Sequence, residues 1–202
     1  VFLNDDTEVI TEDWLEQLVR HARHREIGAV GAKLLFEDGA IQHCGIWCRG
    51  GHPVHRYEGA DDDGGYLGAL DVAQNCLAVT GACLAVERSK FVTVGGFSPL
   101  FPNSYNDVDL CLKLLDRGWR TVVEPRARLY HFEASTRDPR IDADDMSRLH
   151  DRWRHRLNND PFDNPNHDAK LSEELPLPAA AAQLSTIDER MEARYWPLDH
   201  TG

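Results

Sequence analysis

Two adjacent carboxylates follow the first apolar run of the chain, in the opening stretch VFLNDDTEV. Because successive side chains on an extended backbone point in opposite directions, Asp5 and Asp6 can face different partners. A hard cation such as Mg²⁺ or Mn²⁺ takes one or two carboxylates and is often shared with substrate phosphates. The dipeptide is also typical of an ordinary turn, so the chemical interpretation depends on other residues.

Three later residues could act with this pair. Asp107 lies in the first turn of a predicted helix that Asn106 caps, where the helix dipole favours an ionised carboxylate. Such a carboxylate can accept a proton from a hydroxyl group. His131 ends the predicted strand of ARLYH, and a neutral imidazole is a common metal ligand. Arg137 could neutralise a pyrophosphate. Taken singly, the acid and the histidine each have an ordinary structural explanation.

The composition limits the classes of partner. The chain has 202 residues, of which 42% are hydrophobic, enough for one domain with a sizeable core. Its formal net charge of -12 argues against nonspecific binding to nucleic acid or to an anionic lipid surface, and leaves a local anion pocket open. No run of about 18 apolar residues occurs, which predicts that no helix spans a membrane.

The five cysteines do not indicate a disulfide framework, because their number is odd and their spacing irregular. A reducing compartment is therefore expected. Histidines and cysteines gather over residues 43–55, where a zinc site is a second interpretation. The spacing matches no standard zinc motif, and no second pair of the CxxC type exists.

The elements that must position these residues alternate between strands and helices, which is typical of an α/β layer architecture. In open α/β sheets, ligands bind beyond the carboxyl ends of strands, where the acidic turn and His131 would both lie. After Asn158 the sequence shifts to a Pro-rich tail, expected to be an extension or linker. The patterns predict strands over 1–3, 27–36, 78–86, 121–124 and 127–131, helices over 12–22 (capped by Thr11), 88–94, 107–117 (capped by Asn106) and 141–157, and loops with short strands over 40–75.

Five stretches then occur in order: FLNDDTEV, GAVGAKLLFEDGAIQHCG, AVTGACLAVERSKFVTVGGFSPLF, NDVDLCLKLLDRGW and ARLYHFEASTR. Together they resemble the family 2 glycosyltransferases with a GT-A fold, including the rhamnosyltransferase-like bacterial enzymes. The resemblance runs from residue 1 to about Asn166. It implies a mixed central sheet flanked by helices, with a transferase core over residues 1–158 and a carboxyl-terminal extension over residues 159–202.

The resemblance also assigns roles to particular residues. Asp6 matches the metal-binding acid of the family's DxD-type motif, and His131 matches the histidine that completes the Mg²⁺ or Mn²⁺ site. Asp107 matches the catalytic base, the second acid of a Glu-Asp pair whose first position is Asn106 here. His43 is expected in a structural or supporting role. The residues implied in donor binding are Asn4, Asp5, Gly81, Ala82 and Arg137.

The implied reaction is an inverting transfer of a sugar from a nucleotide-diphosphate donor to an acceptor hydroxyl. The resemblance suggests dTDP-rhamnose or a UDP-sugar as donor and a glycan or lipid-linked acceptor, in cytoplasmic polysaccharide or glycoconjugate synthesis at the inner face of the membrane. Family members carry further βα units before the acidic motif. This chain is therefore expected to lack those units, to have little activity alone, and to expose a sheet edge that favours self-association.

Two other classes of protein use the same residue types. A non-catalytic scaffold derived from a transferase would bind sugar, nucleotide or a partner protein, and its binding would not depend on a metal. A divalent-metal hydrolase or nucleotidyltransferase would release diphosphate without transferring a sugar. Retention of Asp6, Asp107 and His131 together favours the transferase over a decayed site.

Overall fold

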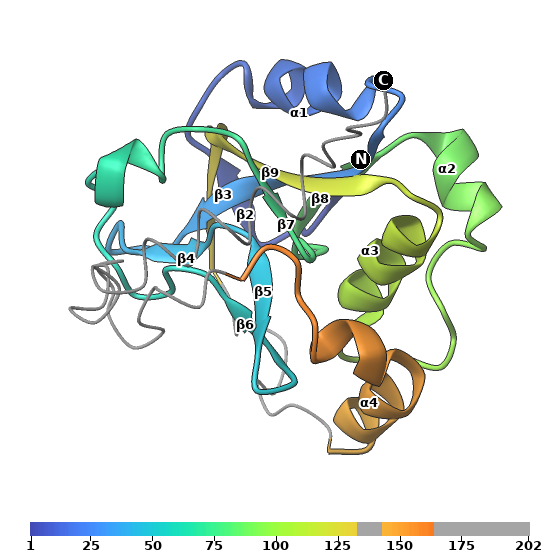
Figure 1. Ribbon diagram of the computed structural model, residues 1–202. Helices are drawn as coiled ribbons and strands as arrows, with labels where there is room; N and C mark the ends of the chain where they lie inside the picture. Colours follow the sequence, from blue (N-terminus) through green and yellow to red (C-terminus); the bar gives the residue numbers. More distant parts are fainter. Residues whose placement is uncertain (133–142, 164–202) are drawn as a thin grey trace, which may run out of the picture. The chain divides into compact units, whose positions relative to one another are not determined.

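The computed structural model describes residues 1–132 and 143–163, which lie in a compact unit from Val1 to Asp163. Its centre is a mixed seven-stranded sheet in the order β1-β8-β3-β9-β2, with β4 beside β3 and β7 beside β9 (Figure 1). The expected mixed sheet flanked by helices is confirmed. The strands of this sheet are β1 (Phe2–Leu3), β2 (Thr7–Val9), β3 (Ile27–Leu35), β4 (Ile41–His43), β7 (Gln74–Cys76), β8 (Cys83–Val86) and β9 (Arg120–His131).

The two central strands are β3 and β9, which run parallel to each other. Every residue of β3 is buried, as its unbroken apolar run predicts for a strand covered on both faces. The register with β9 shifts between Ala32 and Lys33, opposite the segment of β9 that contains Pro125. Proline cannot donate to the ladder, which is why the sequence predicted two strands here. That prediction is wrong, because β9 continues past the proline and resumes pairing at Arg128.

Two helices cover opposite faces of the sheet (Figure 1). On one face, α1 (Trp14–Ala22) packs Leu18 into a cluster that includes Leu129 of β9. On the other face, α3 (Asn106–Asp116) buries its apolar side against β3 and β9. The next helix, α4 (Ala143–Leu157), packs against α3. The sheet therefore carries two separate hydrophobic cores, one beneath each helical layer.

The remaining elements are short. The segment over 40–75 contains loops and short strands, as the sequence predicted. Its glycines include Gly64 and Gly65, which have positive φ angles of 91° and 64° in the turn before a single 3₁₀ turn. The segment over 40–75 holds the hairpin of β5 (Ile46–Arg49) and β6 (His52–His55) and the 3₁₀ turn η1 (Tyr66–Gly68). The short helix α2 (Arg88–Thr93) follows β8.

Both predicted helix caps differ from those in the structure. The cap of α1 is Asp13, whereas Thr11 lies in the segment between β2 and α1, where its backbone N donates to the carbonyl of Arg128. The helix α3 begins one residue earlier than predicted. Its cap is Tyr105, which adopts the left-handed conformation with a φ angle of 62°, and Asn106 is the first helical residue.

The predicted strand over 78–86 is also too long. The strand β8 begins only at Cys83, although Ala78 forms an isolated bridge with Ile46. The intervening backbone is used elsewhere, because the N–H groups of Thr80 and Gly81 donate to side chains of other elements. The apolar run predicted the burial of this segment correctly, but not its departure from the sheet.

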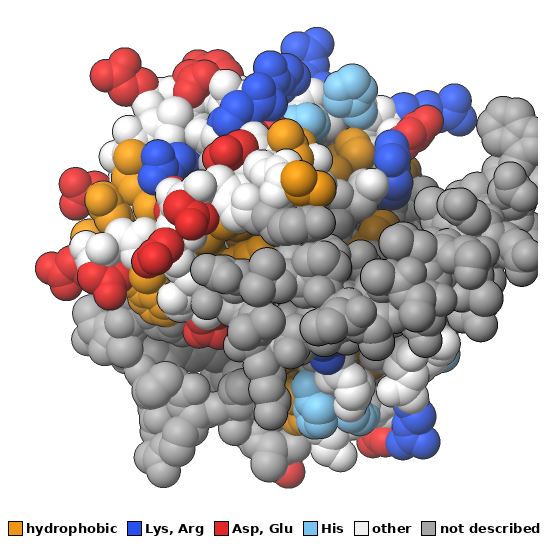
Figure 2. Space-filling view, turned by 60° about the vertical axis from the view of Figure 1, so that its left-hand side comes forward, with side chains coloured by type: hydrophobic (Ala, Val, Ile, Leu, Met, Phe, Trp, Pro, Cys, Tyr) orange, Lys and Arg blue, Asp and Glu red, His pale blue; other side chains and the backbone are white. Residues whose placement is uncertain are grey.

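The surface and the cysteines agree with the composition. All five cysteines are buried in the structure, as small core residues often are. The net negative charge is not spread evenly: acidic side chains gather on one side of the face in Figure 2, and Lys and Arg side chains gather at another. Within the part of the chain that the structure describes, no helix is long and apolar enough to cross a membrane.

Candidate active site

The acidic turn Asn4–Asp6 connects β1 to β2, the first and last strands in the order of the sheet. Strand β1 pairs with β8, whereas β2 pairs with β9, yet only three residues separate them. Since a chain spans at most about 3.6 Å per residue, the sheet must curl until the end of β1 lies near the start of β2. Backbone bonds fix the turn on both sides: Asn4 N donates to Ala82 O at 2.9 Å, and Phe132 N donates to Asp6 O at 2.9 Å.

The structure brings Asp6 and His131 together, as the metal-site prediction requires. The register of β2 with β9 places Thr7 opposite His131, so the preceding Asp6 lies beside the imidazole. Asp6 Oδ1 is 3.2 Å from His131 Nε2, and the side chains are 21% and 10% exposed. This contact lacks hydrogen-bond geometry, and Asp6 Oδ1 is a buried oxygen with no hydrogen-bond partner. Asn4 Nδ2 reaches the same ring nitrogen at 3.4 Å, whereas Asp5 is exposed.

Sequence reasoning missed Gln42, which holds the other side of the histidine ring. Its Oε1 is 2.6 Å from His131 Nδ1, and its Nε2 donates to the His131 carbonyl at 3.2 Å. Gln42 lies in β4 and is only 3% exposed. The sequence held only a weak signal, an amide between Ile41 and His43 in a segment predicted as loops with short strands. Once such a side chain is buried, it normally has a specific partner.

The predicted base lies at the other side of the acidic turn. Asp107 Oδ2 accepts from Gly81 N at 2.8 Å, and its Oδ1 accepts from Val108 N at 2.8 Å. Gly81 is next to Ala82, whose carbonyl holds Asn4, so a continuous set of backbone contacts joins Asp107 to the acidic turn. An ionised carboxylate has about four lone-pair sites. Two hydrogen bonds therefore leave Asp107 able to accept a proton.

A buried side chain of α4 holds the loop that precedes Asp107. The carboxylate of Asp145 is fully buried and accepts from Ser104 N at 3.1 Å, while Arg148 Nη1 donates to its other oxygen at 2.6 Å. This bond fixes the backbone beside Tyr105, the residue in the left-handed conformation. Burial raises the pKa of the Tyr105 hydroxyl, and Asp107 and Asp145 add to the effect. The phenol is therefore neutral at physiological pH.

The second acid of α3 has a different role. Asp109 is fully buried and turned toward α4, where Trp153 Nε1 donates to its Oδ1 at 2.8 Å. Its Oδ2 is 3.2 Å from Lys113 Nζ. The bond from Trp153 joins α3 to α4, whereas the contact with Lys113 lies within α3. Asp107 is the acid of the first turn of this helix that lies beside the Gly81 backbone.

His43 supports the segment that carries Gly81. Its Nε2 accepts from Gly45 N at 3.2 Å and from Thr80 N at 3.4 Å. Burial lowers the pKa of His43 well below its usual value, and the nearby His55 and His131 lower it further. The imidazole is therefore neutral and acts as an acceptor for the backbone, which is the structural role expected from the sequence.

The donor set at Asp6 and His131 fits a divalent cation shared with a diphosphate. One carboxylate and one imidazole converge there, and a buried carboxylate oxygen lacks a partner. A cation that keeps substrate oxygens and water needs no more than one or two protein carboxylates. No cluster of three or more His, Cys, Asp or Glu residues suited to a metal occurs among residues 1–132 and 143–163, so the second interpretation, zinc over 43–55, gains no support. Arg137 lies outside the described residues.

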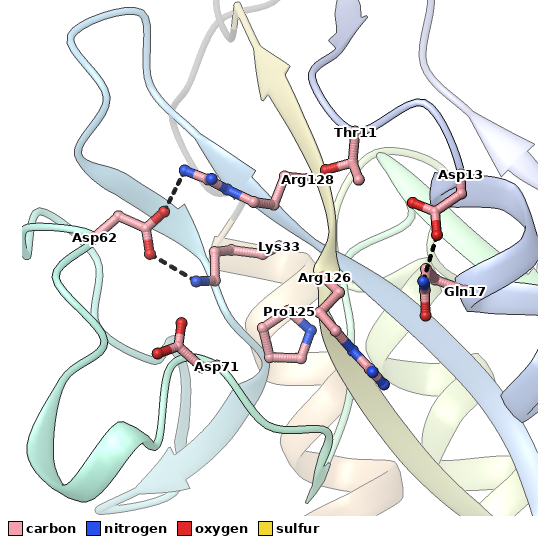
Figure 3. Close-up of a pocket in the computed structure, with 9 residues that line it drawn as sticks. All are labelled: Thr11, Asp13, Gln17, Lys33, Asp62, Asp71, Pro125, Arg126 and Arg128. Atoms are coloured by element: carbon pink, nitrogen blue, oxygen red, sulfur yellow. Dashed lines mark hydrogen bonds and ion pairs between the residues drawn. The ribbon is translucent and has the colours of Figure 1, made fainter.

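A separate polar pocket of about 600 Å³ lies along β9 (Figure 3). It contains none of the predicted site residues. Asp62 bridges two cationic side chains of its lining, with Oδ1 2.6 Å from Lys33 Nζ and Oδ2 2.6 Å from Arg128 Nη2. These ion pairs tie the loop that carries Asp62 to β3 and β9. The pocket is lined by Thr11, Asp13, Gln17, Lys33, Asp62, Asp71, Pro125, Arg126 and Arg128.

The chain is similar in sequence to proteins named for O-antigen biosynthesis and for rhamnosyl transfer. No family model matches it. It is 40% identical over 148 residues to the O-antigen biosynthesis protein RfbC of Myxococcus xanthus, covering 71% of this chain and 11% of that protein. It is 41% identical over 63 residues to an N-acetylglucosaminyl-diphospho-decaprenol L-rhamnosyltransferase of Mycobacterium tuberculosis, covering 30% of this chain and 20% of that enzyme. An uncharacterized protein of Sinorhizobium fredii, y4gI, is 38% identical over 179 residues, covering 81% of this chain and 19% of that protein.

These similarities confirm the resemblance to the rhamnosyltransferase-like glycosyltransferases. The chain spans at most 20% of the length of the three relatives. The similarity therefore concerns a part of each relative, and the reaction that the part performs has to be argued from its own residues.

Proposed function

We propose that the chain carries catalytic residues of an inverting family 2 glycosyltransferase with a GT-A fold. The reaction moves a sugar from a nucleotide-diphosphate donor to an acceptor hydroxyl. The observation that supports it most is the contact of Asp6 with His131, which brings together two residues far apart in the sequence at the edge where ligands bind in α/β sheets. The similarity to RfbC and to a rhamnosyltransferase supports sugar transfer as the reaction class.

Asp107 is the proposed general base. It takes the proton of the acceptor hydroxyl as the hydroxyl oxygen forms a bond to the anomeric carbon and the bond from that carbon to the diphosphate breaks. Attack from the face opposite the leaving group inverts the configuration. The Gly81 N–H and the first turn of α3 hold the carboxylate in position. A positioned base of this kind contributes about 10²–10⁴-fold to a rate.

Asp6 and His131 are the residues that would hold Mg²⁺ or Mn²⁺. When bound, the cation would neutralise charge that develops on the leaving diphosphate. Asn4 and Asp5 would lie beside the donor on the same turn, and Gly81 and Ala82 would line it as small residues. A Cβ built on Gly81 would be 3.6 Å from Asp107 Cβ, so even one added carbon would occupy space next to the base.

The proposed donor is dTDP-rhamnose or a UDP-sugar, and the acceptor is a glycan or a lipid-linked sugar. The proposed setting is bacterial polysaccharide or glycoconjugate synthesis in the cytoplasm, at the inner face of the membrane when the acceptor is lipid-linked. Arg137 is a further proposed contact of the donor. The proposed boundary between transferase core and carboxyl-terminal extension is residue 158.

Sugar transfer by the full-length protein tests this proposal. A panel of nucleotide-diphosphate sugars is incubated with candidate acceptors and Mn²⁺, and the anomeric configuration of the product is read by proton NMR. Asp107→Asn is expected to lower kcat by about 10²–10⁴-fold. Asp116→Asn is the matched control, because this acid lies at the far end of the same helix and pairs with Arg156 on the surface. Retained configuration, or equal rates for both variants, would overturn the assignment of Asp107.

A further inference from the structure

We infer that Gln42 is a positioning residue that fixes the imidazole of His131 with its Nε2 directed at the divalent cation. This inference rests on the proposed function, because it concerns the metal site of the same reaction. Gln42 itself is not a ligand of the cation. It acts through His131, and its effect is on how well the histidine is prepared to bind.

The orientation of the Gln42 amide follows from one contact. Its nitrogen lies 3.2 Å from the backbone carbonyl of His131, and a carbonyl oxygen can only accept a hydrogen bond. The amide oxygen must therefore be the atom that faces the ring, 2.6 Å from His131 Nδ1. An amide oxygen is itself only an acceptor, so Nδ1 must carry the proton of this bond. The glutamine thus fixes both the rotation and the tautomer of the ring.

The same tautomer leaves a lone pair on Nε2. This nitrogen is 3.2 Å from Asp6 Oδ1, which is also an acceptor, and 3.4 Å from Asn4 Nδ2, a long hydrogen bond. Two acceptors at such a distance repel each other unless a cation or a proton lies between them. The unpartnered, buried Asp6 Oδ1 is consistent with a place for a cation at this point.

The pairing of β4 with β3 in the sheet, rather than a contact in the proposed metal site, determines where Gln42 lies. It lies in β4, which pairs with β3 through Leu34 and Leu35, and its side chain is almost fully buried. Neighbouring side chains on a strand point in opposite directions. His43 accordingly bonds the backbone of Gly45 and Thr80, whereas Gln42 reaches His131. A rigid strand thus supplies the partner that metal-bound histidines usually have on their second nitrogen.

Binding of Mn²⁺ to the full-length protein tests the inference without any turnover. Free Mn²⁺ is measured by electron paramagnetic resonance in the presence of a nucleoside diphosphate. Gln42→Leu keeps the approximate size of the side chain and removes the two hydrogen bonds to His131, and it is expected to weaken Mn²⁺ binding by about 10–100-fold. Gln42→Glu keeps an acceptor for Nδ1 and is expected to recover most of the affinity.

A matched control separates this effect from general loss of stability. Gln74 also bonds a backbone carbonyl and a side chain, those of Ala69 and Arg56, away from His131. Gln74→Leu should leave Mn²⁺ affinity unchanged, and circular dichroism confirms that each variant is folded. Mn²⁺ affinity equal to that of the unaltered protein in a folded Gln42→Leu variant would overturn the inference while leaving the metal site intact. Absence of Mn²⁺ binding in the unaltered protein would instead overturn the proposed metal site, and the inference with it.

Discussion

Replacement of Asp62 by asparagine removes the anion that neutralises a buried ammonium group. Lys33 is only 2% exposed, and its Nζ lies 2.6 Å from Asp62 Oδ1 in the pocket of Figure 3. Asp62 is itself 11% exposed and also bonds Arg128, whose side chain is 41% exposed. After the substitution, the guanidinium of Arg128 can turn toward water. The ammonium group of Lys33 is buried, so its charge is left without a partner.

The size of the effect follows from this difference in burial. Removing one partner of a buried ion pair costs about 3–5 kcal/mol, because the other charge is left uncompensated. The half-exposed Arg128 pair adds about 1 kcal/mol or less. For a domain of about 150–250 residues, each kcal/mol lowers the melting temperature by about 2–4 °C. Asp62→Asn is therefore expected to cost about 3–6 kcal/mol and to lower the melting temperature by about 6–24 °C.

Thermal and urea unfolding, followed by circular dichroism, measure this change. Lys33→Met with Asp62→Asn is expected to recover most of the loss, because the double variant leaves no charge without a partner in the core. Asp71→Asn is the control, since Asp71 lines the same pocket but is exposed; its effect should stay within about 0.5 kcal/mol. A melting temperature of Asp62→Asn within about 2 °C of the unaltered protein, less than a 1 kcal/mol loss would produce, would refute the reasoning.

Two further predictions concern packing and pH. A Cβ on Gly31 would lie 2.5 Å from Val79 Cβ, so Gly31→Ala is expected to cost about 1–3 kcal/mol in urea unfolding, and an unchanged midpoint would contradict this close packing. The lowered pKa of buried His43 means that the unfolded chain binds more protons below about pH 6.5, so stability should fall as the pH falls through that value. His43→Phe should flatten the dependence between about pH 7 and 5, and an unchanged slope would show that other groups cause it.

The parts of the fold that sequence predicts well are those whose pattern repeats locally. The strand β3 was predicted because its apolar run is continuous, and α3 because its apolar residues recur at helical spacing and Gly118 ends it with a φ angle of 84°. The predicted break at Pro125 was wrong. A proline indicates a missing donor, but only the pairing of β9 with β3 on both sides of it decides that the strand continues.

The candidate site was predicted in part. The residue types, the positions of Asp6 and His131 at strand ends and of Asp107 in a first helical turn, and the family resemblance pointed to these three residues. The structure brings Asp6 to His131. Gln42 could not be assigned a role from the sequence. Its partner lies on β9, and the contact depends on the pairing of β4 with β3 and of β3 with β9, which no local pattern encodes.

The cap of α3 shows the same limit. Asn106 is the residue type that usually caps a helix, yet Tyr105 occupies the cap in a conformation that few side chains adopt. The reason is tertiary, since the fully buried carboxylate of Asp145 in α4 holds the N–H of Ser104. The backbone that leads to the proposed base is therefore set by a helix much later in the chain.

The position of the metal tests the central claim most directly. Crystals of the protein soaked with Mn²⁺ and a nucleoside diphosphate would be measured for anomalous scattering by manganese. We predict a single strong peak within coordination distance of a carboxylate oxygen of Asp6 and of Nε2 of His131, bridging to the diphosphate. A diphosphate bound with no manganese at these two residues, or with manganese at another group of residues, would contradict the proposed transfer site.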